Sequence, residues 1–410
     1  MRFYIRTLGC KVNAYDAQLI TETLIKNGYI FTDKPEEADI FLVNTCAVTE
    51  TASKKSLAAL KRAKKSSSGV TVAVGCLAEI EPGALRGSCD VIIGAKCVSR
   101  ITDILGAYKN AKPPAAAANT QITRFDGHTR AYVKIQDGCS DNCAYCAVPL
   151  ARGRPRSRAP GECAAECKTL AQNGYKEIVI SGINISLYGK DFKNGGAALG
   201  RLIRDIQTID GIERIRFSSV SPNLITDGFL EEVSRCGKVC PHFHLSLQSG
   251  CDKTLSNMGR RYDTSLYESA VLKIRRLYPA ASVSTDIIAG FPGETEDDFA
   301  QSLAFAEKQR FAKIHVFPFS PKRGTRAFLM QGQIASCEKR RRAQMLLALS
   351  KAMRESFLND NIGRVMPVLV EKRENGFSCG YSDNYIWVKI ARDCAPNTVQ
   401  TVTAARHMMK

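Results

Sequence analysis

The chain has 410 residues, too many for a single hydrophobic core, and its length predicts two or three domains. Hydrophobic residues make up 44% of the sequence and charged residues 24%, which is typical of a globular protein. No apolar run reaches the length of a transmembrane helix, and the first residues lack the apolar core of a secretory signal. We therefore expect a cytoplasmic protein that makes no use of a membrane.

The net charge of +18 predicts a polyanionic partner, and nucleic acid is the commonest such partner. Basic side chains gather in three parts of the sequence: Lys54, Lys55, Lys61, Arg62, Lys64 and Lys65; then Arg152, Arg154, Arg156 and Arg158; then Lys339, Arg340, Arg341 and Arg342. Any one such cluster is more often a solvated surface than a binding site.

The first segment predicts a parallel sheet with crossover helices. Apolar runs predict three strands, at 3–8, 39–44 and 70–75. Amphipathic stretches at 14–28 and 52–66 predict the helices between them. This alternation is typical of a βαβαβ unit.

A cysteine follows each of these three strands, at Cys10, Cys46 and Cys76. The carboxyl ends of parallel strands meet at one edge of the sheet, so the three thiols are expected to converge there. One such cysteine alone would more often be a packing residue. For three in equivalent positions we favour an iron–sulfur cluster that lacks a fourth protein ligand.

The middle of the chain predicts an incomplete parallel barrel. Residues 111–120, rich in proline and alanine, predict a linker before it. Six apolar runs then predict its strands: 131–136, 177–182, 214–219, 243–248, 282–290 and 313–319. Parallel barrels carry their chemistry on the loops that follow the strands, and the sequence motifs of this segment fall on those loops.

Three cysteines follow the first of these strands at C-x3-C-x2-C spacing: Cys139, Cys143 and Cys146. A structural zinc site is the main alternative, but it generally needs four ligands. The next thiols, Cys163 and Cys167, lie four residues apart in a predicted helix and do not supply a second ligand pair. We therefore favour an iron–sulfur cluster whose fourth iron is open and chelates S-adenosylmethionine.

The last segment predicts a small antiparallel β-barrel of the kind that commonly binds RNA. Its apolar runs are 365–372, 376–382 and 385–390. Three aromatic residues there are candidates either for base stacking or for core packing: Tyr381, Tyr385 and Trp387. We thus expect an α/β protein with a parallel-sheet domain at 1–112, a linker at 113–124, an incomplete (β/α)6 barrel at 125–356 and a β-barrel at 357–410.

Several motifs resemble those of the radical S-adenosylmethionine methylthiotransferases: LGCKVNAYD, NTCAVTE, GCSDNCAYCAVPLARGRPRSR, HLSLQSGCDKTLSNMGRRY and TDIIAGFPGETEDDF. The order of the segments is also similar to that family, which has an amino-terminal cysteine domain, a radical SAM barrel and a carboxyl-terminal TRAM domain. The resemblance covers nearly the whole chain.

The resemblance implies catalytic roles for the barrel cysteines. Cys139, Cys143 and Cys146 would hold a 4Fe-4S cluster that reduces S-adenosylmethionine and releases a 5'-deoxyadenosyl radical. Tyr145 matches an aromatic residue that lies beside the cofactor adenine.

Three further positions match cofactor-binding places of the family. Gly182 and Asn184 occupy the place of its glycine-rich strand-two motif, although SGIN stands here instead of the widespread GGE form. Gln248 follows the fourth strand, where contacts with cofactor or substrate are expected.

The same resemblance implies that Cys10, Cys46 and Cys76 hold a second, auxiliary 4Fe-4S cluster, whose open iron carries the sulfur to be methylated and transferred. The branches of the family act on isopentenyladenosine in tRNA, on threonylcarbamoyladenosine in tRNA, or on an aspartate of a ribosomal protein. GCKVN and KIHVFPFSPKRGT look like the threonylcarbamoyl branch, because Lys11 and Val12 replace the Gln-Met of the isopentenyl branch.

We therefore expect methylthiolation at C2 of threonylcarbamoyladenosine next to the tRNA anticodon. The implied partners are tRNA, an electron donor similar to flavodoxin or ferredoxin, and a sulfur donor that the sequence does not identify. The alternatives are the other two substrates and, in a different functional class, a metal-dependent RNA-binding protein without catalysis. An open metal position argues against the last, because a purely structural site gains nothing from a missing ligand.

Overall fold

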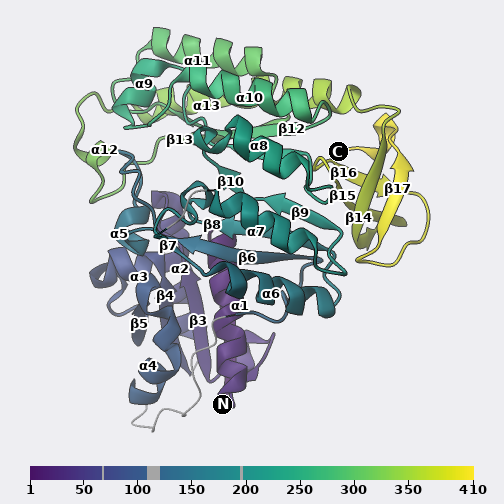
Figure 1. Ribbon diagram of the computed structural model, residues 1–410. Coiled ribbons are helices and arrows are strands. Elements are labelled where there is room, and N and C mark those ends of the chain that lie inside the picture. Colours follow the sequence, from purple (N-terminus) through teal and green to yellow (C-terminus); the bar gives the residue numbers. More distant parts are fainter. Residues whose placement is uncertain (67–68, 109–120, 194–196) are drawn as a thin grey trace. The chain divides into compact units, whose positions relative to one another are not determined.

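The computed structural model describes residues 1–66, 69–108, 121–193 and 197–410 (Figure 1). Their contacts define two compact units. The first comprises Met1–Asp126, Gln136–Arg156 and Pro321–Phe328, and the second comprises Gly127–Ile135, Ser157–Ser320 and Leu329–Lys410. The predicted linker lies mostly within 109–120, outside the described residues, and the predicted domain boundaries stay a prediction.

The first unit contains a five-stranded parallel sheet with the order β2-β1-β3-β4-β5. Its strands are β1 (Arg2–Thr7), β2 (Ile30–Phe31), β3 (Ile40–Thr45), β4 (Val70–Gly75) and β5 (Val91–Gly94). Every residue of β3 is buried, as expected for the central strand of a sheet covered on both faces. The predicted strands are β1, β3 and β4, and the short β2 and β5 extend the sheet at its two edges.

Alternate residues of the central strand β3 pack in two different hydrophobic cores. Ile40 and Leu42 pack in one core with Leu24, whereas Phe41 and Val43 pack in another. The helices of the first unit are α1 (Lys11–Lys26), α2 (Glu50–Ser66), α3 (Cys76–Ile80), α4 (Ile101–Tyr108) and α5 (Val148–Arg152), with 3-10 turns η1 (Pro35–Glu37), η2 (Pro82–Leu85) and η3 (Ala95–Arg100). The period-two alternation within β3 therefore builds two cores from one strand.

The strands predicted for the parallel barrel lie mostly in the second unit, although the end of β6 and the start of β7 belong to the first. They form two sheets, with the orders β7-β6-β8-β9 and β10-β11-β12-β13. The strands are β6 (Arg130–Asp137), β7 (Arg156–Ser157), β8 (Glu177–Gly182), β9 (Arg214–Phe217), β10 (Ser219–Val220), β11 (His242–Leu245), β12 (Ser282–Ala289) and β13 (Lys313–Pro318). The third predicted strand is divided at Ser218, which separates β9 from β10 and places the two pieces in different sheets.

Helices alternate with these strands, which confirms the predicted α/β class. They are α6 (Pro160–Gln172), α7 (Ala198–Gln207), α8 (Asp227–Ser234), α9 (Asp252–Asn257), α10 (Thr264–Leu277), α11 (Glu296–Gln309), α12 (Arg326–Leu329) and α13 (Ser336–Asn359), with 3-10 turns η4 (Ile185–Leu187), η5 (Pro222–Leu224) and η6 (Arg406–Met408). In the described part of the chain, every helix is too short or too polar to cross a membrane.

The carboxyl-terminal segment forms a four-stranded antiparallel sheet with the order β16-β15-β14-β17. Its strands are β14 (Val365–Glu374), β15 (Phe377–Ser382), β16 (Trp387–Ile390) and β17 (Val399–Thr403). Met366, Val368 and Val388 are fully buried in its core. The antiparallel carboxyl-terminal domain predicted from the sequence is therefore confirmed.

Candidate metal centres

The amino-terminal cysteines lie at the carboxyl ends of three neighbouring strands. Cys10 precedes α1 and is exposed, whereas Cys46 follows β3 and Cys76 begins α3, and these two are 4% and 9% exposed. Gly9 adopts a φ of +109°, and a Cβ added there would lie 2.9 Å from the Cβ and 3.0 Å from the Sγ of Cys46. The turn before Cys10 therefore packs closely on Cys46, and only glycine fits there.

Asn13 connects the loops that carry these three cysteines. Its Nδ2 donates hydrogen bonds to the carbonyl oxygens of Leu8, at 2.8 Å, and Thr45, at 2.9 Å. The Cys76 thiol donates to Asn13 Oδ1 at 3.9 Å. Asn44 Nδ2 in turn donates to the Asn13 carbonyl oxygen at 2.7 Å. Asn13 and Asn44 thus connect the strand ends that carry the three cysteines. No pattern in the sequence indicated this role for them.

Arg152 lies beside the same loops and is only 2% exposed. Its Nη2 donates to Asn13 Oδ1 at 2.7 Å and to Asp16 Oδ2 at 2.9 Å, and its Nη1 donates to Asp137 Oδ2 at 3.1 Å. Burial on its own would lower the pKa of this guanidinium, but Asp16 and Asp137 outweigh burial and raise the pKa. Arg152 therefore belongs to a buried charged cluster and not to a solvated basic surface.

The thiols near Arg152 have raised pKa values. Burial raises the pKa of Cys76 to about 11, and the charge of Arg152 acts in the opposite direction. Burial also raises the pKa of Cys46. Iron binds the thiolate, so cluster binding at these residues would release protons. Neighbouring thiols beside a buried cation fit an iron–sulfur cluster, because the cation would offset the cluster's negative charge.

The second cysteine set is built within one loop after β6. The Cys139 N–H donates to the carbonyl oxygen of Gly153 at 3.0 Å, and the Cys146 N–H donates to that of Cys143 at 3.0 Å. Gly138 adopts a φ of +73°, and a Cβ added there would lie 2.1 Å from the Arg154 carbonyl oxygen. Backbone hydrogen bonds and a glycine turn therefore shape this loop.

Backbone N–H groups also point at two of these sulfurs. The Asp141 N–H donates to Cys139 Sγ and the Val148 N–H donates to Cys146 Sγ, both at 3.5 Å. Within the described residues, no three or more Cys, His, Asp or Glu side chains are placed to hold a single metal ion. In an iron–sulfur cluster the thiolates bind different irons, and N–H donors to sulfur are a normal part of its environment. The two N–H donors to sulfur therefore fit an iron–sulfur cluster held by this loop.

The segment 321–328 supports this loop from a distant part of the sequence. Arg326 Nη2 donates to the Asn142 carbonyl oxygen at 2.8 Å, and the Ala327 N–H donates to that of Ala144 at 2.7 Å. Both cysteine sets and this segment belong to the first compact unit. The contact between 321–328 and the loop has no signal in the sequence, because both bonds use backbone atoms of the loop.

The predicted cofactor residues fall into different units. Tyr145 is half-buried on the cysteine loop of the first unit. In the second unit, Gly182 ends β8, and Asn184 accepts a hydrogen bond from the Ser186 N–H at 3.3 Å. Gln248 adopts a φ of +75°, held by two backbone hydrogen bonds to β12. Their roles toward the cofactor stay a prediction.

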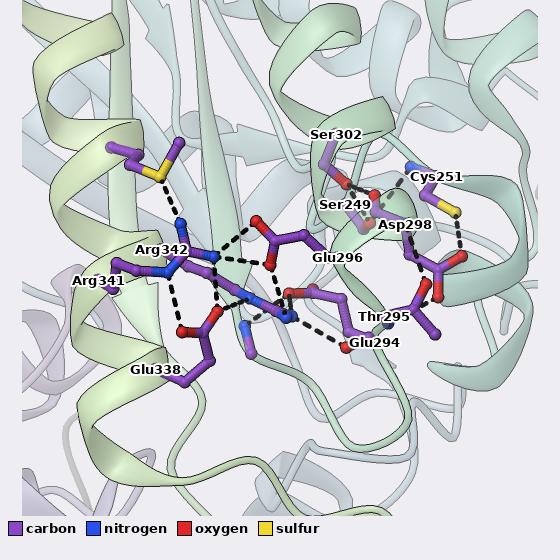
Figure 2. Close-up of polar contacts among 12 residues, drawn as sticks. Ser249, Cys251, Glu294, Thr295, Glu296, Asp298, Ser302, Glu338, Arg341 and Arg342 are labelled. Atoms are coloured by element: carbon purple, nitrogen blue, oxygen red, sulfur yellow. Dashed lines mark hydrogen bonds and ion pairs between the residues drawn. The ribbon is translucent and has the colours of Figure 1, made fainter.

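The AGFPGET turn after β12 anchors helices α11 and α13 (Figure 2). Glu294 Oε1 accepts hydrogen bonds from the Gly290 N–H, at 3.0 Å, and from Arg342 Nη1, at 2.7 Å. Thr295 and Asp298 form a capping box that starts α11. Arg342 is 5% exposed, so the basic cluster 339–342 is partly a buried ion-pair network. This motif therefore has a clear structural role in the turn.

Polar side chains line one face of strands β11 to β13. His244 Nδ1 lies 3.0 Å from Ser284 Oγ, and His244 Nε2 lies 3.1 Å from Asp286 Oδ2. The ring of His315 lies 5.5 Å from that of His244. The alternate residues of β12, such as Thr285, face the opposite side, where Thr285 bonds to the α10 residue Tyr267. No pattern in the sequence indicated this cluster of polar side chains around His244, because its members come from three different strands.

The aromatic residues predicted in the carboxyl-terminal segment are packed within the second unit. Tyr381 and Tyr385 stack with ring centroids 4.3 Å apart, and His242 stacks on Tyr385 at 4.5 Å. Arg130 lies over the Tyr381 ring at 4.8 Å from its centroid. Of the two alternatives, base stacking and packing, the structure supports packing for Tyr381 and Tyr385.

Two family patterns match the chain. The pattern of the Radical SAM superfamily matches residues 133–306, and that of the uncharacterized protein family UPF0004 matches residues 2–94. Among solved structures, the radical S-adenosylmethionine methyltransferase TsrM from Kitasatospora setae, with cobalamin and a [4Fe-4S] cluster bound, has a TM-score of 0.58 at 12% identity. That alignment covers 97% of this chain and 80% of TsrM, and it shows a common fold.

Curated relatives match over most of their length. The threonylcarbamoyladenosine tRNA methylthiotransferase MtaB of Bacillus subtilis is 33% identical, over 93% of this chain and 88% of its own. The protein of the same name from Thermotoga maritima is 34% identical, over 93% and 89%. The tRNA-2-methylthio-N(6)-dimethylallyladenosine synthase of Acetivibrio thermocellus is 34% identical, over 90% and 80%.

The chain belongs to the radical S-adenosylmethionine methylthiotransferase family. It is therefore an enzyme that transfers a methylthio group, and S-adenosylmethionine and a 4Fe-4S cluster follow from the family. The family resemblance inferred from the sequence motifs is confirmed.

Proposed function

We propose that this methylthiotransferase adds a methylthio group to C2 of N6-threonylcarbamoyladenosine next to the anticodon of tRNA. The observation that carries the proposal is the similarity to two relatives named for threonylcarbamoyladenosine, which extends over 88% and 89% of their lengths. Relatives named for dimethylallyladenosine have a similar identity, 34–35%, and are matched over 79–86% of their lengths. Lys11 and Val12 after the first cysteine agree with the first assignment.

The proposal includes a 4Fe-4S cluster at Cys139, Cys143 and Cys146. When bound, such a cluster supplies the one-electron chemistry that activates a strong, non-acidic C–H bond. The protein's part is to hold the three thiolates on a loop shaped by backbone hydrogen bonds and to direct N–H donors at Cys139 and Cys146. Tyr145, on the same loop, is proposed to lie beside the adenine of the cofactor.

The proposal also includes a second 4Fe-4S cluster at Cys10, Cys46 and Cys76, which would hold the sulfur to be transferred. Its support is the packing of Gly9 on Cys46 and the bonds from Asn13 to the loops of all three cysteines. Three thiolates leave one iron without a protein ligand, and a sulfur species needs such a position. Replacing all three cysteines by alanine should halve the iron content from about eight to about four irons per chain.

A tRNA partner is supported by the net charge of +18 and by the basic face of α2. All six basic residues of that helix are exposed: Lys54, Lys55, Lys61, Arg62, Lys64 and Lys65. By contrast, Arg152 and Arg342, from the other two basic clusters, are buried in ion pairs. These two side chains are therefore not exposed for binding to tRNA. If phosphates bind the α2 face, affinity for tRNA must fall steeply with added salt.

The substrate assignment is tested by nucleoside mass spectrometry of tRNA from cells with and without the gene. We expect the methylthio form of threonylcarbamoyladenosine to disappear and the unmodified form to accumulate. Loss of the methylthio form of isopentenyladenosine instead would assign the dimethylallyl branch. Unchanged tRNA, together with a change in ribosomal-protein mass, would assign the aspartate branch.

A further inference from the structure

Arg152 connects the two cysteine loops, because it bonds to residues beside each of them. It lies at the end of α5, shortly after Cys146, and bonds to Asp137, which precedes Cys139. On its other side it bonds to Asn13 and Asp16 of α1, the helix that begins after Cys10. All these residues belong to the first compact unit.

The guanidinium is buried together with two carboxylates. The side chains of Arg152 and Asp16 are 2% and 4% exposed, and that of Asp137 is 18% exposed. Arg152 Nε is buried and has no hydrogen-bond partner among the described residues. Since solvent screens these charges little, their effect on neighbouring groups is strong.

The amino-terminal thiols are among those neighbouring groups. Arg152 opposes the rise in the pKa of Cys76 and of Cys46 that burial causes, and the charge of Cys10 acts on Arg152. The Cys76 thiol and Arg152 Nη2 also share an acceptor, Asn13 Oδ1, at 3.9 and 2.7 Å. The positive charge of Arg152 is therefore placed to act on whatever these thiolates bind.

We propose that Arg152 and Asp16 set the reduction potential of the cluster bound by Cys10, Cys46 and Cys76. Arg152 would act on the cluster through its charge, without binding iron. The inference rests on the proposed second cluster. Reduction adds negative charge to a cluster, so a nearby cation favours the reduced form and a nearby carboxylate disfavours it. Arg152 and Asp16, which are hydrogen-bonded to each other, should therefore shift the reduction potential in opposite directions.

The test uses full-length protein in which Cys139, Cys143 and Cys146 are replaced by alanine, so that only the amino-terminal cluster is reconstituted. Iron content and an EPR-monitored redox titration are measured in this background and in Arg152→Gln and Asp16→Asn variants. The Arg152→Gln potential should become more negative and the Asp16→Asn potential less negative. We expect each to change the equilibrium constant for reduction about tenfold, which is about 59 mV for one electron.

Arg158→Gln is the matched control. Arg158 comes from the same arginine-rich run and pairs with a buried carboxylate, Glu166, but it belongs to the second unit. Its replacement should leave the potential unchanged.

The outcomes separate the two proposals. If the protein with Cys139, Cys143 and Cys146 replaced by alanine binds no iron, the proposal of a second cluster is wrong. About four irons per chain, with potentials that do not move or that move in the same direction in both variants, would overturn the role of the charged pair. If Arg152→Gln loses the cluster, Asp16→Asn decides alone: a less negative potential supports the inference and an unchanged one overturns it.

Discussion

The two cysteine centres are built in different ways. Residues 139–146 form one loop, shaped by backbone hydrogen bonds between near neighbours such as Cys143 and Cys146. The amino-terminal centre is assembled from three strand ends and depends on side chains, above all on Asn13. Residues 321–328 also bond to the loop 139–146, but at its backbone atoms, so we expect the loop to depend less on single side chains than the assembled centre does.

Replacing single cysteines should give the largest difference in activity between the two centres. Cys143→Ala should abolish cleavage of S-adenosylmethionine, because the cofactor needs the open iron of that cluster. Cys46→Ala should retain cleavage and lose methylthio transfer. The measurement is 5'-deoxyadenosine and methylthiolated nucleoside from the same anaerobic reaction. Loss of cleavage in both variants would show that the two centres do not function separately.

Removal of the connecting amide should affect only the assembled centre. Asn13→Ala loses the bonds to Leu8 and Thr45 and the acceptor of Cys76, so we expect iron to fall from about eight to about four per chain. Asn27→Ala is the control, because Asn27 caps the carboxyl end of the same helix and its side-chain Nδ2 donates to the carbonyl oxygen of Thr23 within that helix. Iron is measured by chemical analysis after reconstitution. Retention of all the iron in Asn13→Ala would contradict a joining role for this residue.

The sequence signals for the two cysteine sets differ in kind. The spacing of Cys139, Cys143 and Cys146 is itself the signal of a cluster loop. The convergence of Cys10, Cys46 and Cys76 followed from the rule that parallel strands end at one edge. No such rule identifies Asn13 as the partner of Arg152, because the two residues lie far apart in sequence and meet only in the folded chain.

The same limit applies to charge and aromatic patterns. Arg152 and Arg342 belong to basic runs, but they are buried against carboxylates from other parts of the chain. Tyr381 and Tyr385 stack on each other. The sequence shows which residue types gather along the chain, and only the tertiary packing decides which of them face solvent.

Replacement of a buried carboxylate in the second unit tests whether iron binding depends only on side chains near the cysteines. Glu177 is fully buried and pairs with Arg216 at 2.7 Å and with Arg214 at 2.8 Å. Burial alone would raise its pKa, but Arg216 and Arg214 outweigh burial and lower the pKa to about 2. Glu177→Gln leaves these arginines without their anion, which we expect to reduce the free energy of unfolding by about 3–5 kcal/mol.

The same variant should have the smallest effect on the cysteine centres. Below their melting temperatures, wild type and Glu177→Gln should bind equal iron, because Glu177 belongs to the unit that holds neither cysteine set. Since the folded pKa lies below the ordinary value of 4.5, the stability from Glu177 is complete above pH 4.5 and is lost as the pH falls toward 2. Denaturant unfolding across this range should therefore show a difference between the two proteins that is constant at neutral pH and shrinks in acid. A difference that grows in acid, or a variant that loses iron while folded, would show that buried charge in the second unit also supports the metal centres.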